Sequence, residues 1–210
     1  MLGDPTPEQA ALLEPVERFC RETLPDLAVE CEQTSEPPSR EWRRKFAELG
    51  VLGINAREEF GGMGLAPIDA IMVLERFASV SSAAAFPVFE ALVGPVRIVE
   101  RFGSPALAQR IVPAVIAGDI VVAISMSEPG AGTALTDLTT RARFDGDDIV
   151  LTGTKRWCSG GGHADAYAVF CRLSDAPGAK GIGAVLVEAD TPGVSFGAQE
   201  QLMGWRGVSS

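Results

Sequence analysis

Two short segments of the chain combine hydroxyl side chains, glycines and one tryptophan. Residues 125–133 (SMSEPGAGT) turn an apolar stretch into a glycine-rich loop with hydroxyls on both sides. Residues 152–159 (TGTKRWCS) place Trp157 and Ser159 close together on an expected strand. An aromatic face, hydroxyls and backbone amides are what a flavin ring needs, and glycine lets the backbone approach a pyrophosphate. The two segments therefore predict a flavin site.

Six residues of these segments are the candidate cofactor ligands: Met126, Ser127, Gly132, Thr133, Trp157 and Ser159. Each also has an ordinary structural interpretation. Trp157 taken alone would be a half-buried aromatic of a strand, and Gly132 would serve a tight turn equally well. The hydroxyls at Ser127 and Ser159 favour the cofactor interpretation for the cluster as a whole.

Other motifs of the chain closely resemble the acyl-CoA dehydrogenase family in order and spacing. Any one glycine motif would be weak evidence, but together they extend over nearly the whole sequence. The motifs are residues 49–54 (LGVLGI), 58–65 (EEFGGMGL), 102–105 (FGSP), 111–113 (IVP), 117–119 (AGD), 153–155 (GTK) and 203–207 (MGWRG).

This resemblance implies FAD as cofactor and α,β-dehydrogenation of an acyl-CoA thioester as the complete activity. Positions matching Ser127 and Ser159 hydrogen-bond the polar edge of the flavin in the family. The position matching Thr133 lies near the pyrophosphate and the CoA end of the substrate, so Thr133 is also the candidate substrate contact. Ala134 stands where the family usually has aspartate, and Gly160 where asparagine is common.

The resemblance also implies parts that these 210 residues do not provide. The family places its catalytic carboxylate mostly in a C-terminal helical domain, so no catalytic residue is assigned here. We therefore expect this polypeptide alone to bind FAD weakly and not to dehydrogenate acyl-CoA. An electron-transfer flavoprotein as acceptor and a homo- or hetero-oligomer are the implied partners.

Two alternative functions remain open at this point. One keeps the superfamily and changes the chemistry to a flavin-dependent oxygenase or oxidase. The other is a non-catalytic subunit or remnant that pairs with a complete homologue.

Composition excludes several function classes. A net charge of −10 disfavours nucleic-acid binding, which needs a basic surface. The single histidine, His163, and four cysteines without a CxxC pair predict no metal site and reduced thiols. The start of the chain lacks the features of a signal peptide, and no apolar run approaches membrane-spanning length. These observations predict a cytoplasmic protein without membrane contact.

The first part of the chain shows helical periodicity. Thr6 can cap a first helix that continues to about Cys20, and Ser39 can cap a second helix that ends at Gly50. Further helices are expected over 68–77, over 83–102 with a possible division at Gly94, and from Ser104 to Gly118. Residues 1–118 are therefore predicted to form an N-terminal helical domain.

Strand patterns begin at Ile120. Strands are expected over 120–124, 139–144, 149–152, 166–171 and 182–187, with a final one around 194–196. Asp145-Gly146 predicts a hairpin turn. The chain is thus expected to be α+β, with a middle β domain over 119–210 that is built as an antiparallel barrel or sandwich and is truncated.

Overall fold

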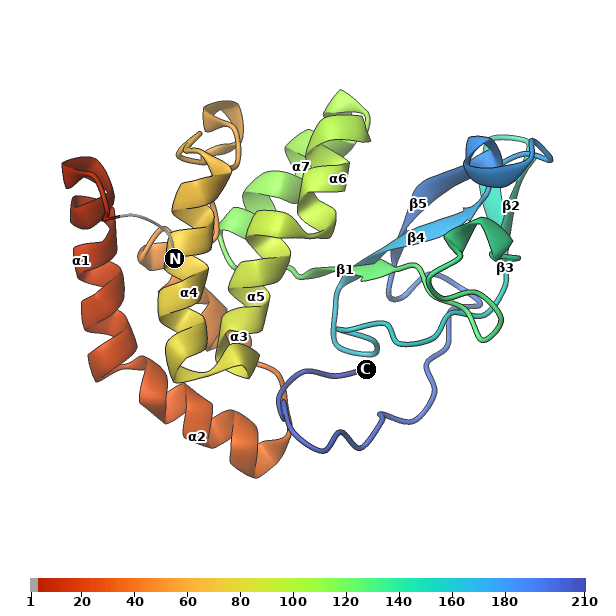
Figure 1. The fold of residues 1–210 in the computed structure, drawn as a ribbon. Helices are drawn as coiled ribbons and strands as arrows, with labels where there is room; N and C mark the ends of the chain where they lie inside the picture. Colours follow the sequence, from red (N-terminus) through yellow and green to blue (C-terminus); the bar gives the residue numbers. More distant parts are fainter. Residues whose placement is uncertain (1–3) are drawn as a thin grey trace. The chain divides into compact units, whose positions relative to one another are not determined.

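The computed structural model describes residues 4–210, which form two compact units (Figure 1). The helical unit comprises residues up to Val121 together with Gln201–Val208. The sheet unit comprises Val122–Glu200 and Ser209–Ser210. The predicted α+β class, with helices first and strands second, is confirmed.

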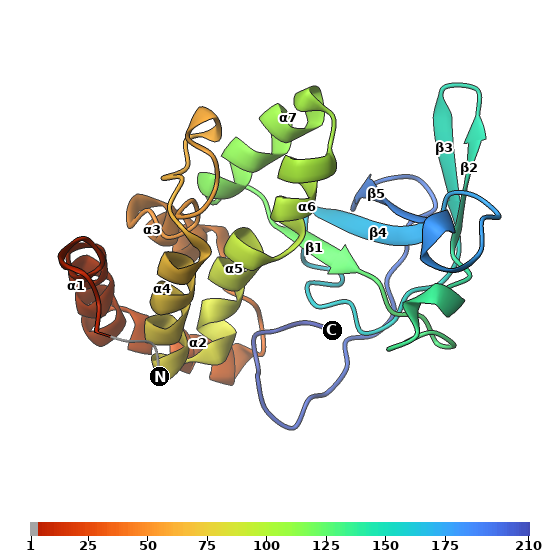
Figure 2. The ribbon, with the colours of Figure 1, turned by 45° about the horizontal axis from the view of Figure 1, so that its top comes forward.

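Seven α-helices of the described chain build the helical unit, and two views show them (Figures 1 and 2). They are α1 (Pro7–Glu22), α2 (Leu24–Thr34), α3 (Arg40–Glu48), α4 (Pro67–Val80), α5 (Ser82–Val93), α6 (Pro95–Phe102) and α7 (Pro105–Ile116). A short 3-10 helix, η1 (Glu58–Phe60), lies in the loop before α4.

The helix starts follow local capping chemistry. The Thr6 hydroxyl accepts a hydrogen bond from the backbone N–H of Gln9, whose side chain in turn accepts from the Thr6 N–H. The Ser39 and Ser104 hydroxyls likewise accept from the backbone N–H groups of Trp42 in α3 and Leu107 in α7. Because such caps satisfy N–H groups that have no partner inside the helix, they fix where each helix begins.

The structure contains one helix that was not expected, and it decides whether the helix expected over 83–102 is divided. The first helix, α1, ends at Glu22, close to the expected end at about Cys20. A further helix, α2, which was not predicted, follows it, and Thr23 leaves helical geometry between the two. The expected long helix over 83–102 is divided at Gly94, whose non-helical backbone ends α5 and precedes Pro95. Proline suits the first position of a helix because its missing N–H needs no partner there.

The stretch Ser82–Phe102 corrects the statement that no apolar run approaches membrane-spanning length. Its 21 residues are long and apolar enough to span by length and composition alone. However, 56% of its most apolar window is buried inside the structure, and Gly94 divides it into α5 and α6. It is best explained as core of the helical unit.

Three phenylalanines lie at the centre of this core. Phe46 of α3 contacts Phe77 of α4 edge to face at 5.4 Å, and Phe19 of α1 stacks on Phe77 at 5.9 Å. Phe46 and Phe77 are fully buried. Such aromatic contacts add to the free energy gained by apolar burial and hold α1, α3 and α4 together.

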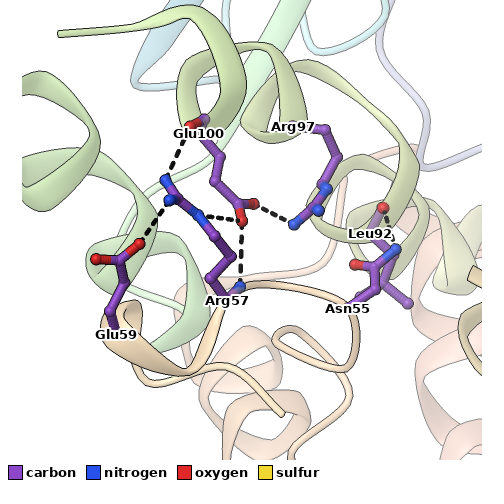
Figure 3. Close-up of polar contacts among 6 residues, drawn as sticks. All are labelled: Asn55, Arg57, Glu59, Leu92, Arg97 and Glu100. Atoms are coloured by element: carbon purple, nitrogen blue, oxygen red, sulfur yellow. Dashed lines mark hydrogen bonds and ion pairs between the residues drawn. The ribbon is translucent and has the colours of Figure 1, made fainter. Parts of the chain in front are cut away.

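A buried carboxylate fixes the irregular loop between α3 and α4 (Figure 3). Glu100 of α6 accepts hydrogen bonds from the backbone N–H and Nε of Arg57, and pairs with Arg97. Arg57 also donates to the Glu100 carbonyl and pairs with Glu59. Because the Glu100 side chain is 1% exposed, these partners are needed to balance the cost of burying its charge.

The sheet unit contains one five-stranded sheet. Its strands are β1 (Val122–Ser125), β2 (Arg141–Asp145), β3 (Asp148–Thr152), β4 (Ala166–Arg172) and β5 (Ile182–Glu188). β2 and β3 form the predicted hairpin, with Gly146 at φ 64° in the turn, and β4 pairs antiparallel with β5.

Two details of the sheet correct the expectation of an antiparallel barrel or sandwich. β4 pairs in parallel with β1, and through a single residue pair with β2, so the sheet is mixed. The strand order β1-β4-β2-β3, with β5 also paired to β4, does not close into a barrel. The strand expected at 194–196 is absent, because residues 189–200 after β5 contain no strand.

The segment Gln201–Val208 returns to the helical unit. The Trp205 ring contacts Phe86 of α5 edge to face at 5.3 Å. Arg206 donates to the Glu32 carbonyl at 3.5 Å, near the C-terminal end of α2. Gly207 lies so close to Cys31 that an added Cβ would stand 2.7 Å from the Cys31 Cβ. The helical unit is therefore discontinuous in sequence.

Candidate functional site

The first candidate segment leaves the sheet where β1 ends at Ser125. A tight turn follows, in which the backbones of Glu128 and Ala131 exchange hydrogen bonds at 2.8 and 3.1 Å. A Cβ added at Gly130 or Gly132 would meet no atom within 4 Å. Open space above both glycines is what a ligand phosphate approaching the backbone requires.

Trp157 corrects the expectation that the second segment is a strand. β3 ends at Thr152, and Trp157 lies in a loop with a left-handed φ of 58°. Bulky residues rarely adopt this conformation, and such outliers concentrate at functional sites. The Arg156 guanidinium lies 4.4 Å from the centre of the indole ring, and 56% of the Trp157 surface remains exposed.

The structure brings the two segments side by side. The Arg156 N–H donates to the Ser127 carbonyl at 2.9 Å, and Lys155 Nζ donates to the Met126 carbonyl at 2.9 Å. The Cys158 thiol lies 3.3 Å from the Ile124 carbonyl. Residues 124–127 therefore run beside residues 155–158, although they are far apart in sequence.

A buried carboxylate, Glu128, ties this arrangement to the start of β2. Its oxygens accept hydrogen bonds from the Thr139 N–H at 2.6 Å, the Thr140 N–H at 2.9 Å and Lys155 Nζ at 2.8 Å. Burial alone would raise the pKa of Glu128, but hydrogen bonds from Lys155, Thr140 and Thr139 outweigh burial and hold that pKa well below its usual range. Glu128 is thus an anion at neutral pH.

Tyr167 of β4 fixes the loop that follows Ser159. Its hydroxyl accepts from the Gly162 N–H and donates to the Gly160 carbonyl, both at 3.0 Å. Burial raises the pKa of Tyr167, so the phenol is neutral and can make both contacts.

Reasoning from sequence missed the structural roles of Glu128, Lys155 and Tyr167. The nearest available signal was that Glu128 and Lys155 lie inside the two candidate motifs.

The structure brings some of the candidate cofactor ligands together and does not connect others. Ser127 and Trp157 belong to segments in direct contact, whereas no hydrogen bond within residues 4–210 joins Thr133 or Ser159 to either one. The hydroxyls of Ser127, Thr133 and Ser159 make no side-chain hydrogen bond to another described residue, and none of the three residues is fully buried. Hydroxyls without a side-chain partner among the described residues, together with an exposed indole, fit the polar edge and the ring of a flavin.

Other chemistry-bearing groups lie outside these segments. Among residues 4–210, no three His, Cys, Asp or Glu side chains are placed to hold a metal ion. His163 is an exposed loop residue. Burial raises the pKa of the Cys20 and Cys31 thiols to about 11, so both are unreactive at neutral pH.

Comparison with known proteins gives one consistent result. The profile of the acyl-CoA dehydrogenase N-terminal domain matches residues 6–119, and that of the middle domain matches residues 123–210. The mitochondrial isobutyryl-CoA dehydrogenase of Dictyostelium discoideum is 35% identical over 189 residues, which cover 89% of this chain and 44% of that protein.

Solved structures agree with these matches. Butyryl-CoA dehydrogenase from Megasphaera elsdenii has a TM-score of 0.89 at 26% identity, over 100% of this chain and 55% of that one. A glutaryl-CoA dehydrogenase from Mycobacterium smegmatis in complex with FADH2 has a TM-score of 0.85 at 25% identity, over 98% of this chain and 51% of that one. The chain thus spans about half the length of the relatives it matches.

Proposed function

Because the chain belongs to the acyl-CoA dehydrogenase family, we propose that it supplies the flavin-binding part of an enzyme that dehydrogenates an acyl-CoA at its α,β bond. The observation that carries the proposal is the contact between the Ser127 and Trp157 segments, in which the Trp157 indole is half exposed. The names of the relatives, an isobutyryl-, a butyryl- and a glutaryl-CoA dehydrogenase, support a short acyl-CoA as substrate class.

Each candidate residue has a defined part in this proposal. FAD, when bound, would accept the β-hydride of the substrate. Ser127 and Ser159 would donate hydrogen bonds to the polar edge of the flavin, and Trp157 would offer its ring face. Met126 and Gly132 would contribute backbone, while the Thr133 hydroxyl would serve the pyrophosphate and the CoA end of the substrate. A hydrogen bond to an ionised group is worth more than a neutral one, which suits Thr133 to a phosphate.

The proposal leaves the proton-abstracting base outside these 210 residues. General-base catalysis contributes on the order of 10²–10⁴-fold, so this polypeptide alone should show no appreciable dehydrogenation. An electron-transfer flavoprotein as acceptor, assembly into an oligomer and a cytoplasmic location belong to the same proposal.

Titration of the 210-residue chain with FAD, followed by flavin fluorescence, tests the cofactor site. We expect weak but saturable binding. Ser127→Ala and Ser159→Ala should each weaken it by about fivefold, the equivalent of about 1 kcal/mol for a lost hydrogen bond. Trp157→Ala should weaken it by about tenfold.

Thr154→Val is the matched control, since it removes an exposed hydroxyl of the same segment. Equal losses for Thr154→Val and Ser127→Ala would contradict the assignment. Acyl-CoA-dependent reduction of a dye by this chain alone, at the rate of a complete homologue, would show that its base lies within residues 1–210.

A further inference from the structure

The Lys155–Glu128 ion pair joins the two candidate flavin segments. Glu128 is adjacent to Ser127, and Lys155 lies two residues before Trp157. Their charged atoms are 2.8 Å apart, with the Lys155 side chain 12% exposed and the Glu128 side chain 4% exposed. Neither residue is among the candidate cofactor ligands.

Both members of the Lys155–Glu128 pair make further hydrogen bonds. Glu128 receives one hydrogen bond from the Thr140 backbone and two from Thr139, one of them from its hydroxyl at 2.8 Å. A buried ion pair is stable only when further hydrogen bonds satisfy both partners. Thr139 and Thr140 supply these for Glu128, and the Met126 carbonyl supplies one for Lys155.

The contacts of Lys155 are what couple the segments. Its ammonium binds the Met126 carbonyl and the Glu128 carboxylate at once, so it spans the residues on either side of Ser127. The backbone hydrogen bond from Arg156 to Ser127 lies directly beside it. Displacement of Lys155 would therefore move the Ser127 backbone relative to Trp157.

We propose that Lys155 and Glu128 are positioning residues for the flavin: they set the distance between the Ser127 and Trp157 segments, so that FAD affinity depends on an ion pair that acts through its neighbours. This inference rests on the proposed function, because it concerns the same cofactor site. It adds two residues that the candidate ligands do not include.

The geometry can be tested without any cofactor. The chain has three tryptophans, so labelling with 5-fluorotryptophan gives three ¹⁹F resonances, and Trp157→Phe identifies that of Trp157. We expect Lys155→Met and Glu128→Gln to shift the Trp157 resonance and to leave those of Trp42 and Trp205 in place. Glu100→Gln is the control, because it alters an equally buried carboxylate whose ion-pair partners all belong to the helical unit.

FAD titration of the same variants provides the second measurement. Lys155→Met and Glu128→Gln should each weaken FAD binding by about tenfold or more, and Glu100→Gln by less than about twofold. Thr139→Val removes one hydroxyl donor to Glu128 and should weaken FAD binding by a smaller factor. This variant replaces the two main variants as the test if they fail to fold.

The outcomes separate this inference from the proposed function. An unshifted Trp157 resonance in the folded variants, or unchanged FAD affinity, overturns the positioning role. If the unmodified chain binds no FAD, the proposed function fails, while the ¹⁹F spectra still decide whether the pair holds the two segments together.

Discussion

Three buried carboxylates show how differently one residue type can be used. Glu100 and Glu128 are surrounded by cationic and N–H donors, as their burial requires. Glu90 on α5 is 7% exposed, yet its side chain makes no hydrogen bond to another residue among 4–210. Burial raises the pKa of Glu90 from 4.5 to about 8, and the charge of Arg43 offsets this only in part. Glu90 is therefore a neutral acid at pH 7.

The stability of the chain should consequently depend on pH through Glu90. Between pH 4.5 and 8, folded Glu90 keeps a proton that the unfolded chain releases, so the free energy of unfolding falls as pH rises through this window. We expect a loss on the order of 2–4 kcal/mol from pH 5 to pH 8. Glu90→Gln should abolish that loss in urea titrations, because glutamine stays neutral.

Glu14→Gln on the exposed face of α1 is the control for this measurement and should keep the pH slope of the unmodified chain. If Glu90→Gln also keeps that slope, the protonated state of buried Glu90 is refuted.

At the scale of elements, the loop between α3 and α4 shows how an irregular segment becomes fixed. Glu100 binds both the backbone and the side chain of Arg57, and Asn55 donates to the Leu92 carbonyl at 2.9 Å (Figure 3). α5 and α6 thus fix this loop through polar contacts between residues that are far apart in sequence. Met63 and Leu65 also donate backbone hydrogen bonds to Gly53 and Ile54 across the loop.

Removal of the Glu100 charge should loosen this loop. Glu100→Gln leaves Arg97 without its ionic partner in a mostly buried place, so we expect a loss of about 3 kcal/mol in the free energy of unfolding. Hydrogen exchange should rise over residues 53–65. Glu59→Gln alters a carboxylate on the same arginine that is 59% exposed, and should cost less than about 1 kcal/mol. Equal losses for the two variants would exclude the anchoring role.

Prediction from sequence succeeded where the determinants are local. Thr6 and Ser39 cap helices through residues three positions away, and Asp145-Gly146 forms the turn of its own hairpin.

Prediction failed where the determinants lie far apart in sequence. The Lys155–Glu128 pair spans 27 positions and depends on tertiary folding. The left-handed backbone of Trp157 has no local signal, since tryptophan rarely adopts it. The strand expected at 194–196 did not form, and nothing in the pairing of β5, which pairs only with β4 in the described part of the chain, explains its absence.

At the scale of the whole molecule, the return of residues 201–208 to the helical unit is the main feature that secondary-structure patterns did not predict. The contact is made by residues 203–207 (MGWRG). This motif belongs to the family resemblance, but no packing role was predicted for it from sequence. Gly207 has a left-handed φ of 92° and packs on Cys31, while no atom lies within 4 Å of a Cβ built at Gly204. The two glycines of one motif thus have different structural demands.

These two glycines provide a matched test of the contact. Gly207→Ala forces a Cβ into Cys31 and strains the backbone, so it should destabilise the helical unit by about 2 kcal/mol. It should also increase the acrylamide quenching of Trp205, which is 44% exposed and contacts Phe86. Gly204→Ala should change neither property. Unaltered quenching in Gly207→Ala would mean that the segment does not depend on this close approach.

The discontinuity of the helical unit has a consequence for the order of folding. Residues 122–200 form a loop that must close before 201–208 can reach α2 and α5. The entropic cost of closure grows only slowly with loop length, by about 0.6 kcal/mol for each doubling, so a long insertion is tolerated. During synthesis, however, α1 to α7 leave the ribosome while their last packing segment is still untranslated. The helical unit is therefore completed only after most of the sheet unit has been made.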